Sequence, residues 1–190
     1  LRSGREVLLR PIRPEDEPEH YDFLSRLTPE DIQFRFFGLI GRLPHTQMAR
    51  YTQIDYDREM AFIASAALAD GKRETLGVVR AIADPDNREA EFAIVVRSDL
   101  KGQGLGRKLM DKIVDYLRGR GTRAVVGQVL KDNVNMLALV REIGFERRSV
   151  IDEGVVEVQA GPPGVEVERD LQHELGTPVR VEHAEVVREE

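Results

Sequence analysis

The sequence predicts an α/β (α+β) protein built on one twisted, mixed but mostly antiparallel sheet of about seven strands, flanked by about four helices. Three apolar segments, at 60–69, 75–83 and 90–96, are separated only by the short polar turns DGKRE and DPDNRE, which is typical of an antiparallel meander. A helical stripe then separates the third segment from an apolar run at 122–130. A strand, a helix and a strand in that order predict a right-handed crossover between parallel neighbours.

The N-terminal quarter of the chain predicts one strand and two helices. The segment 5–12, REVLLRPI, alternates as a strand does. Pro14 and the acidic residues that follow favour a helix to about Ser25, because proline suits a first helical turn and carboxylates stabilise its positive end. Thr28, followed by a proline and by Asp31 at the third helical position, predicts the start of a second, short helix.

Two further helices are predicted in the C-terminal half. Apolar residues four apart form one stripe that ends near Gly119; they are Leu105, Leu109, Ile113 and Leu117. The segment 132–143 is amphipathic and is capped near Asp132 or Asn133. Gly144 supplies the left-handed position that ends this helix.

The domain organisation follows from where these patterns stop. Residues 145–160 predict a closing hairpin, so we assign 1–160 to one domain. Residues 161–190 form an acidic C-terminal extension in which VEVERDL could add one more strand. Because the first residue is Leu1 rather than Met, we expect the chain to be excised from a longer multidomain protein.

Composition restricts the protein class. The chain has 190 residues, 41% hydrophobic and 33% charged, as an ordinary soluble globular protein has. No apolar stretch approaches the roughly 20 residues of a membrane helix, and no basic-then-apolar leader is present. The absence of cysteine excludes disulfides and thiolate metal sites. We therefore expect a cytoplasmic protein without a membrane partner.

The charge is unevenly distributed along the chain. From Val150 onward, eleven acidic residues against three basic ones give a local charge of −8, which leaves +2 for the remainder. Between Arg97 and Arg123, eight basic residues stand against three acidic ones. A basic segment inside an acidic protein favours a small polyanion over nucleic acid as the ligand.

The basic segment contains the run RSDLKGQGLGRKLM, residues 97–110. Its glycines follow the spacing G-x-G-x-G, whereas a dinucleotide-binding turn needs G-x-G-x-x-G, and no G-K-S/T follows to make a P-loop. The remaining functional interpretation is a pyrophosphate held by backbone N–H groups, the dipole of the next helix and the basic side chains. The alternative is a glycine-rich turn with a solvated basic rim.

The run VVRSDLKGQGLGRKLM resembles motif A of the GNAT superfamily of acyl-CoA-dependent N-acetyltransferases, whose pattern is Q/R-x-x-G-x-G/A. Lys101 stands at the Gln/Arg position, which keeps a charge but loses the fork of arginine. Asn133, Gly144 and Phe145 resemble the superfamily's N…Y…GF ending. The resemblance covers residues 7–158 and implies the GNAT fold, in which two parallel strands splay apart at the acyl-CoA site.

The resemblance also implies a cofactor site. The loop would grip the pyrophosphate of acetyl-CoA, the co-substrate, and the preceding strand would lie along the pantetheine arm, with no metal involved. Asn133 would hydrogen-bond the pantetheine or simply cap its helix. The residues implied in cofactor binding are Ile94, Val95, Val96, Lys101, Gly102, Gln103, Gly104, Leu105, Gly106, Arg107 and Asn133.

Acyl transfer to an amine requires a general base, because a lysine amine with a reference pKa of about 10.4 is protonated at neutral pH. Glu91 lies five residues before Val96, about 16 Å along a strand, which is comparable to an extended pantetheine arm. It also matches the catalytic Glu of related protein acetyltransferases. Glu89 projects from the same strand face and is the second candidate. Alternatively, Glu91 is a surface carboxylate paired with Arg80.

The other catalytic roles are less well marked. Main-chain N–H groups of residues 93–95 are candidates to stabilise the oxyanion. Val140 stands where many family members have a Tyr that protonates the departing thiolate. Three tyrosines are candidate substitutes or structural residues: Tyr51, Tyr56 and Tyr116. His20 and His45 have no second ligand at metal spacing, and we expect both on the surface.

The N-terminal third, together with the segment from Glu74 through the glycine loop, resembles the GNAT domain of Pat-type protein lysine acetyltransferases. This implies fusion to an ADP-forming acyl-CoA synthetase-like domain and a protein substrate, an AMP-forming acyl-CoA synthetase inactivated by acetylation of its active-site lysine. Six acidic residues form a negative rim for that substrate or are ordinary solvated charges: Glu15, Asp16, Asp31, Asp55, Asp57 and Glu59. The alternatives are a small-amine N-acetyltransferase and a catalytically silent acyl-CoA sensor.

Overall fold

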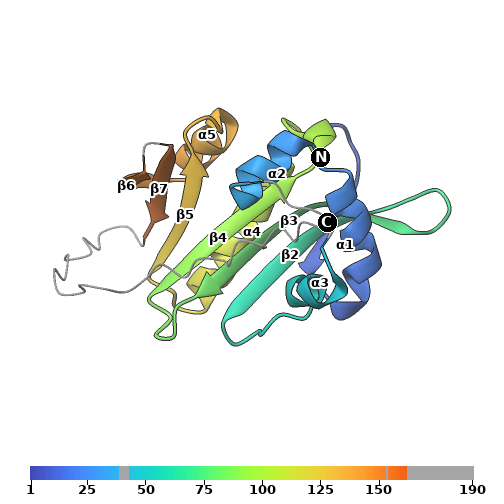
Figure 1. The fold of residues 1–190 in the computed structure, drawn as a ribbon, viewed down its shortest axis with the longest axis horizontal. Coiled ribbons are helices and arrows are strands. Elements are labelled where there is room, and N and C mark those ends of the chain that lie inside the picture. The colour runs from blue at the N-terminus through green and yellow to red at the C-terminus, as the bar shows by residue number, and fades with distance from the viewer. Residues whose placement is uncertain (39–42, 153, 162–190) are drawn as a thin grey trace, which may run out of the picture.

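The computed structural model describes residues 1–38, 43–152 and 154–161, and over these residues it has one seven-stranded sheet in the order β1-β2-β3-β4-β5-β7-β6 (Figure 1). The strands are β1 (Leu8–Pro11), β2 (Glu59–Ala67), β3 (Arg73–Ala83), β4 (Glu89–Val96), β5 (Ala124–Leu130), β6 (Glu146–Asp152) and β7 (Val155–Ala160). This confirms the predicted mixed α/β class, including the antiparallel meander of β2, β3 and β4. The extra strand suggested for VEVERDL lies outside the described residues.

Five α-helices and two short 3-10 helices occur in the described residues. They are η1 (Pro14–Asp16), α1 (Glu17–Ser25), α2 (Pro29–Phe36), α3 (His45–Thr52), η2 (Ser98–Leu100), α4 (Leu105–Gly119) and α5 (Val134–Glu142). The capping box predicted for α2 is present, because Thr28 accepts a hydrogen bond from the backbone of Asp31 and its own backbone N–H donates to the Asp31 carboxylate. The sequence did not predict α3, which has eight residues and no side-chain cap.

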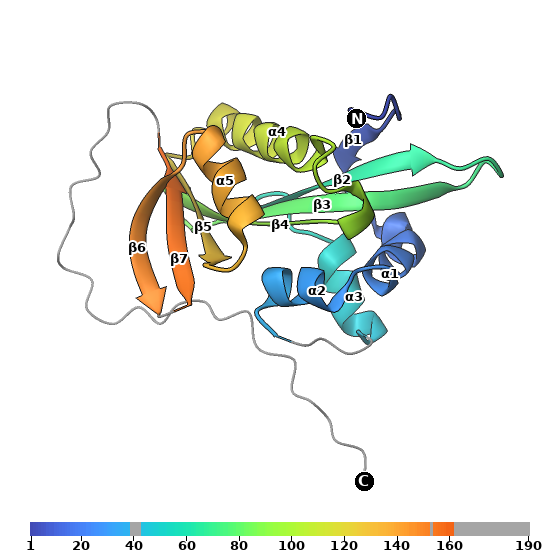
Figure 2. The same cartoon turned by 90° about the horizontal axis from the view of Figure 1, so that it is seen from above.

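The helices cover both faces of the sheet (Figure 2). Helices α4 and α5 lie on one face, where the stripe of α4 is buried against the sheet. Helices α1, α2 and α3 lie on the other face. There Phe23 of α1 packs with Ile63 and Val95 in a second, smaller core.

The parallel pair formed by β4 and β5 is short. Pairing joins Glu89 to Ala124 and ends at Glu91 and Val126, so the second half of β4 has no partner in β5. On its other edge, β4 pairs with β3 as far as Val96. The two parallel strands thus splay apart beyond Glu91, as the family resemblance implied.

Candidate active site

The open edge of β4 presents backbone donors toward the splay. The N–H of Arg97 donates to the carbonyl of Leu76 in β3, and antiparallel pairing alternates the direction of backbone groups along a strand. The N–H groups of Phe92, Ile94 and Val96 therefore face β5. Of the three amides proposed for the oxyanion, residues 93–95, only that of Ile94 points to the open side.

A close contact lies immediately beyond the last paired residues. An added Cβ on Gly127 of β5 would come within 2.3 Å of the Phe92 ring, so glycine is required for the ring to pack there. Phe92 is buried and meets Phe145 edge-on, with ring centroids 5.4 Å apart. The glycine and the two aromatic rings fix the point at which β4 and β5 part.

The glycine loop joins β4 to α4 in the predicted way. Gly102 and Gly104 have φ values of +75° and +84°, a conformation that L side chains rarely adopt. Gly104 is the N-cap of α4, and the first bond of the helix runs from the N–H of Lys108 to the Gly104 carbonyl at 3.2 Å. The amides of residues 105–107 precede that bond and have no intrahelical acceptor, as expected at a helix N-terminus.

The space around the loop also suits an anion. No heavy atom lies within 4 Å of a Cβ built on Gly102 or Gly104, so a ligand can approach the backbone there. The loop therefore offers donors and space, which suits the pyrophosphate of an acyl-CoA.

The basic side chains of the loop are not equally available. The Lys101 ammonium lies 2.7 Å from the carboxylate of Asp31 in α2, and thus forms an ion pair with the opposite layer. Arg107 is 3.3 Å from Asp111 and half-exposed. The Lys108 side chain is exposed and makes no hydrogen bond or ion pair among the described residues. The roles of Lys101 and Arg107 in cofactor binding stay predictions.

Glu91 lies where the splay begins. Its side chain is exposed, and among the described residues its carboxylate has no hydrogen bond or ion pair. Desolvation by the surrounding protein raises its pKa, and the charges of Glu89 and Glu157 raise it further, while Arg35 acts in the opposite direction. A solvent-accessible carboxylate with a raised pKa has the properties of a general base.

The two carboxylates differ in their ion-pair partners, and the alternative in which Glu91 pairs with Arg80 is wrong. Arg80, the expected partner of Glu91, instead bonds Glu59 at 3.1 Å and the backbone carbonyl of Tyr51. Glu89 pairs with Arg148 at 2.8 Å. Of the two carboxylates, Glu91 alone is without an ion-pair partner in the described residues.

Arg35 is a residue of this site that sequence reasoning missed. It lies in the last turn of α2 and stacks its guanidinium 4.8 Å from the centroid of Phe36. Burial lowers its pKa to about 10, and Tyr51 and Glu91 oppose that shift. A basic residue at a helix C-terminus is common on any surface, so the sequence held no signal that α2 would bring it near Glu91.

The remaining catalytic candidates are mainly structural. Val140 is 2% exposed and carries no acid. The Tyr56 hydroxyl donates to the Ile12 carbonyl at 2.7 Å, and Tyr116 packs edge-on against Phe62. The Asn133 side chain accepts from the N–H of Met136 at 3.1 Å, so its capping role is confirmed and its contact with pantetheine stays a prediction.

The prediction that both histidines lie on the surface is wrong for His20. This side chain is 3% exposed, because α1 turns it toward Phe23 and the ring of Tyr51. Burial lowers its pKa to about 4, so the ring is neutral at pH 7. His45 is exposed and lies 2.5 Å from Glu17, as expected for a surface residue.

The predicted negative rim is reduced by internal ion pairs. Asp16 is buried against Arg10 at 2.6 Å, and Asp31 is buried against Lys101. Glu59 forms an ion pair with Arg80. The three rim residues that remain exposed are Glu15, Asp55 and Asp57.

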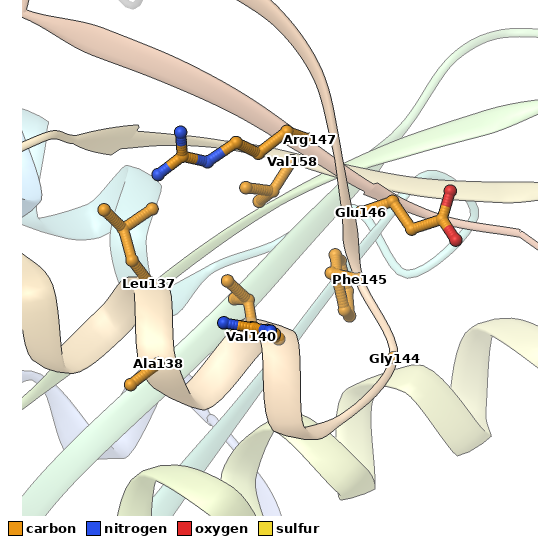
Figure 3. A pocket seen from close by; sticks show the side chains of 9 residues that line it. Leu137, Ala138, Val140, Gly144, Phe145, Glu146, Arg147 and Val158 are labelled. Carbon is orange, nitrogen blue, oxygen red and sulfur yellow. The ribbon is translucent and has the colours of Figure 1, made fainter.

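A cavity of about 660 Å³ lies between α5 and the β6–β7 hairpin, and Glu91 is not among its lining residues (Figure 3). Val140, Phe145 and Val158 form its apolar wall, and Arg147 and Glu146 extend along its rim. It is open, and none of the loop glycines lines it. It is therefore not the acyl-CoA site predicted from the sequence.

The described ranges contain neither a metal-binding cluster nor a membrane-spanning helix. No group of three or more His, Asp or Glu side chains there could hold a metal ion. Within the same ranges no helix has both the length and the apolar character required to cross a bilayer.

A glycine loop at a helix N-terminus, beside a splayed parallel pair, suits a ligand that carries a pyrophosphate, such as an acyl-CoA. Residues 24–145 match the model of the Acetyltransferase (GNAT) family. The chain therefore belongs to the GNAT family of acetyltransferases.

Individual relatives agree with this assignment. The chain is 33% identical over 145 residues to Acetyltransferase PA5475 of Pseudomonas aeruginosa, covering 76% of this chain and 77% of the relative. The crystal structure of the GNAT domain of S. lividans PAT superposes with a TM-score of 0.76 at 26% identity, covering 85% and 94% of the two chains. The spermidine N-acetyltransferase of Vibrio cholerae, solved with CoA and spermine, shares the fold with a TM-score of 0.65 at 18% identity, covering 82% and 95%.

Proposed function

We propose that this acetyltransferase moves the acetyl group of acetyl-CoA to the ε-amine of a lysine in a protein, with Glu91 as the general base. The observation that carries this proposal is the exposed, unpaired carboxylate of Glu91 at the start of the splay, with its raised pKa. The AMP-forming acyl-CoA synthetases are the proposed substrates, and metabolic regulation in the cytoplasm is the proposed role.

The cofactor would lie along elements already described. The pyrophosphate is held by the amides of the glycine loop and the first turn of α4, and the pantetheine arm lies along the unpaired half of β4. The thioester carbonyl then falls near Glu91. The N–H of Ile94, which faces the open side, donates to the carbonyl oxygen as negative charge develops on it.

The reaction follows from these positions. Glu91 accepts a proton from the substrate ammonium, directly or through a water, and the free amine attacks the thioester carbon. A C–N bond forms, the C–S bond breaks and CoA leaves as a thiolate, while the nitrogen gives up its second surplus proton to the thiolate or to water. Because a thiol has a reference pKa near 8.5, the thiolate can leave without the acid that Val140 lacks.

Two observations support a protein as the acceptor. The fold is most fully matched by the GNAT domain of S. lividans PAT among the neighbours described above. Glu91 is exposed, so an acceptor lysine on another protein can approach it. In addition, Glu15, Asp55 and Asp57 remain exposed and acidic, which favours a basic, lysine-bearing segment. Fusion to a larger acyl-CoA synthetase-like domain is part of the same proposal.

The proposal is tested by incubating the protein with acetyl-CoA and an AMP-forming acetyl-CoA synthetase, followed by mass spectrometry of synthetase peptides. We expect acetylation of the synthetase active-site lysine and loss of synthetase activity. A synthetase with Arg at that lysine is the control and should stay unmodified there. Labelling no faster than in the absence of this protein would contradict the proposal. Acetylation of added spermidine, with the synthetase unmodified, would instead favour a small-amine acetyltransferase.

A further inference from the structure

Asp31, at the start of α2, collects hydrogen bonds from three separate parts of the chain. Its carboxylate accepts from the Lys101 ammonium at 2.7 Å and from the Ser98 hydroxyl, which lies 2.8 Å from both of its oxygens. It also accepts from the backbone N–H of Thr28 at 3.1 Å. Asp31 is 3% exposed. These donors hold its pKa below the usual range although burial acts in the opposite direction, so the carboxylate is ionised.

Only part of this arrangement is needed to begin a helix. The capping box of α2 uses Thr28 and Asp31 alone. The bonds from Ser98 and Lys101 come instead from η2 and from the residue that immediately precedes Gly102. Because a buried carboxylate is costly when a partner is lost, Asp31 favours the one conformation of residues 98–101 that supplies both donors.

The Lys101 side chain extends away from the helix layer whose amides would hold a pyrophosphate. Helix α2 lies on the sheet face opposite to α4 (Figure 2). Lys101 therefore extends from the loop toward the α2 layer, whereas the amides that would hold a pyrophosphate belong to the α4 layer. The φ of +75° at Gly102 and of +84° at Gly104 turn the chain between these two layers.

We propose that the Asp31–Lys101 ion pair fixes the glycine loop in the conformation that binds acyl-CoA. Asp31 is then a positioning residue, and Lys101 acts through Asp31 rather than as a ligand of the pyrophosphate. Since α2 also carries Arg35, whose charge lowers the pKa of Glu91, the same helix connects the cofactor loop with the proposed base. This inference rests on the acetyl-CoA site of the proposed function.

The substitution Asp31→Asn distinguishes a positioning role of the ion pair from direct phosphate binding by Lys101, because the two roles predict opposite changes in CoA affinity. If Lys101 is a phosphate ligand, removing the competing carboxylate frees its charge and CoA binds more tightly. If the ion pair positions the loop, the same substitution releases Lys101 and residues 98–101, and CoA binds more weakly. We expect the dissociation constant to rise about tenfold, a change of about 1.4 kcal/mol.

The measurement is isothermal titration of CoA into the wild type and a set of variants, with the melting temperature recorded for each. Lys101→Met should weaken binding as Asp31→Asn does, and the double variant should bind no more weakly than either single variant, because both remove one interaction. Lys101→Arg preserves the pair and should restore affinity. Glu30→Gln removes an equal charge 3.7 Å from Lys101 and is the control, with binding within about twofold of wild type.

Ser98→Ala provides a second route if Asp31→Asn fails to fold. It removes one hydrogen bond to Asp31 without changing any charge, and positioning predicts weaker CoA binding. Tighter or unchanged binding in Asp31→Asn, or in Ser98→Ala if only that variant folds, would overturn the proposal. Additive losses in the double variant would do the same. Failure of the wild type to bind CoA would instead reject the acetyl-CoA assignment itself.

Discussion

At the scale of single residues, the proposed chemistry depends on the charges around Glu91. Desolvation by the neighbouring protein raises the pKa of Glu91, and the positive charge of Arg35 limits that rise. A base must be deprotonated to act, so activity should fall as the pH falls through the pKa of Glu91. Arg35 thus extends the active range toward lower pH without touching the reacting atoms.

Arg35→Met should therefore move the acidic limb of the pH profile to higher pH. Loss of a nearby positive charge disfavours the ionised carboxylate, and we expect a shift of about one pH unit or less. The measurement is kcat/KM against pH for acetyl transfer. Arg50→Met, an exposed arginine in the last turn of α3, is the matched control and should leave the limb in place. An unmoved limb in Arg35→Met would argue against Glu91 as the base.

His20 makes a prediction about stability. Its pKa is lowered by burial to about 4 in the folded protein, against a reference of about 6.5 in the unfolded chain. Between these values the unfolded state binds more protons, so the free energy of unfolding decreases as pH falls from 6.5 and levels off below 4. A shift of this size corresponds to about 3 kcal/mol.

His20→Phe keeps an aromatic ring in the core and removes the titration. Urea unfolding at pH 7 and pH 5 should show a smaller loss of stability in the variant than in the wild type, by about 2 kcal/mol. Equal losses in the two proteins would mean that His20 does not titrate with a lowered pKa.

At the scale of elements, the distance between β4 and β5 is set by small and large residues that face each other. Gly127→Ala would place a Cβ 2.3 Å from the ring of Phe92. Because that ring is held by Phe145, we expect a loss of about 1–3 kcal/mol in the free energy of unfolding, measured in urea. Gly119→Ala, at the end of α4 with no atom within 4 Å of an added Cβ, is the control. The stability of Gly119→Ala should be unchanged or slightly higher. An equal change in the free energy of unfolding of the two variants would contradict a tight contact between Gly127 and Phe92.

Most elements could be predicted because their patterns are local. The meander, α4 and the capping box of α2 each follow from periodicity, turn residues or caps within a short window. Helix α3 has no side-chain cap and only two buried residues, Met48 and Thr52, so its stability comes from packing on α1 and η1. The sequence carries no local signal for such a contact.

The candidate site likewise combines features with a local sequence pattern and contacts between residues far apart in the chain. The glycine loop directly follows β4, the strand of Glu91, so a local pattern was enough to propose both as site residues. Their roles stay predictions. The ion pair of Asp31 and Lys101 joins residues 70 positions apart, and Arg35 acts across a layer contact. The burial of His20 depends likewise on the docking of α1, which a surface-like helical pattern does not reveal.

At the scale of the whole molecule, the two faces of the sheet carry different parts of the proposed site. The α4 face carries the helix N-terminus proposed to hold the acyl-CoA, and α2, which bears Arg35, lies on the opposite face (Figure 2). By strand alternation Glu91 is on the same side of β4 as Val95, which packs in the core beneath α1. We propose that cofactor and acceptor meet at the splay of β4 from β5. Binding and chemistry are thus assigned to different residues and can be measured separately.

The most direct test compares Glu91→Gln with the wild type in two assays, acetyl-CoA binding by titration and acetyl transfer by mass spectrometry. We predict an unchanged dissociation constant and a loss of transfer of about 10²-fold or more, as expected for removal of a general base. Glu89→Gln, the neighbouring carboxylate on the same strand face, should retain transfer. Undiminished transfer by Glu91→Gln would contradict the account, and a wild type that binds acetyl-CoA but acetylates no acceptor would show the protein to be an acyl-CoA sensor.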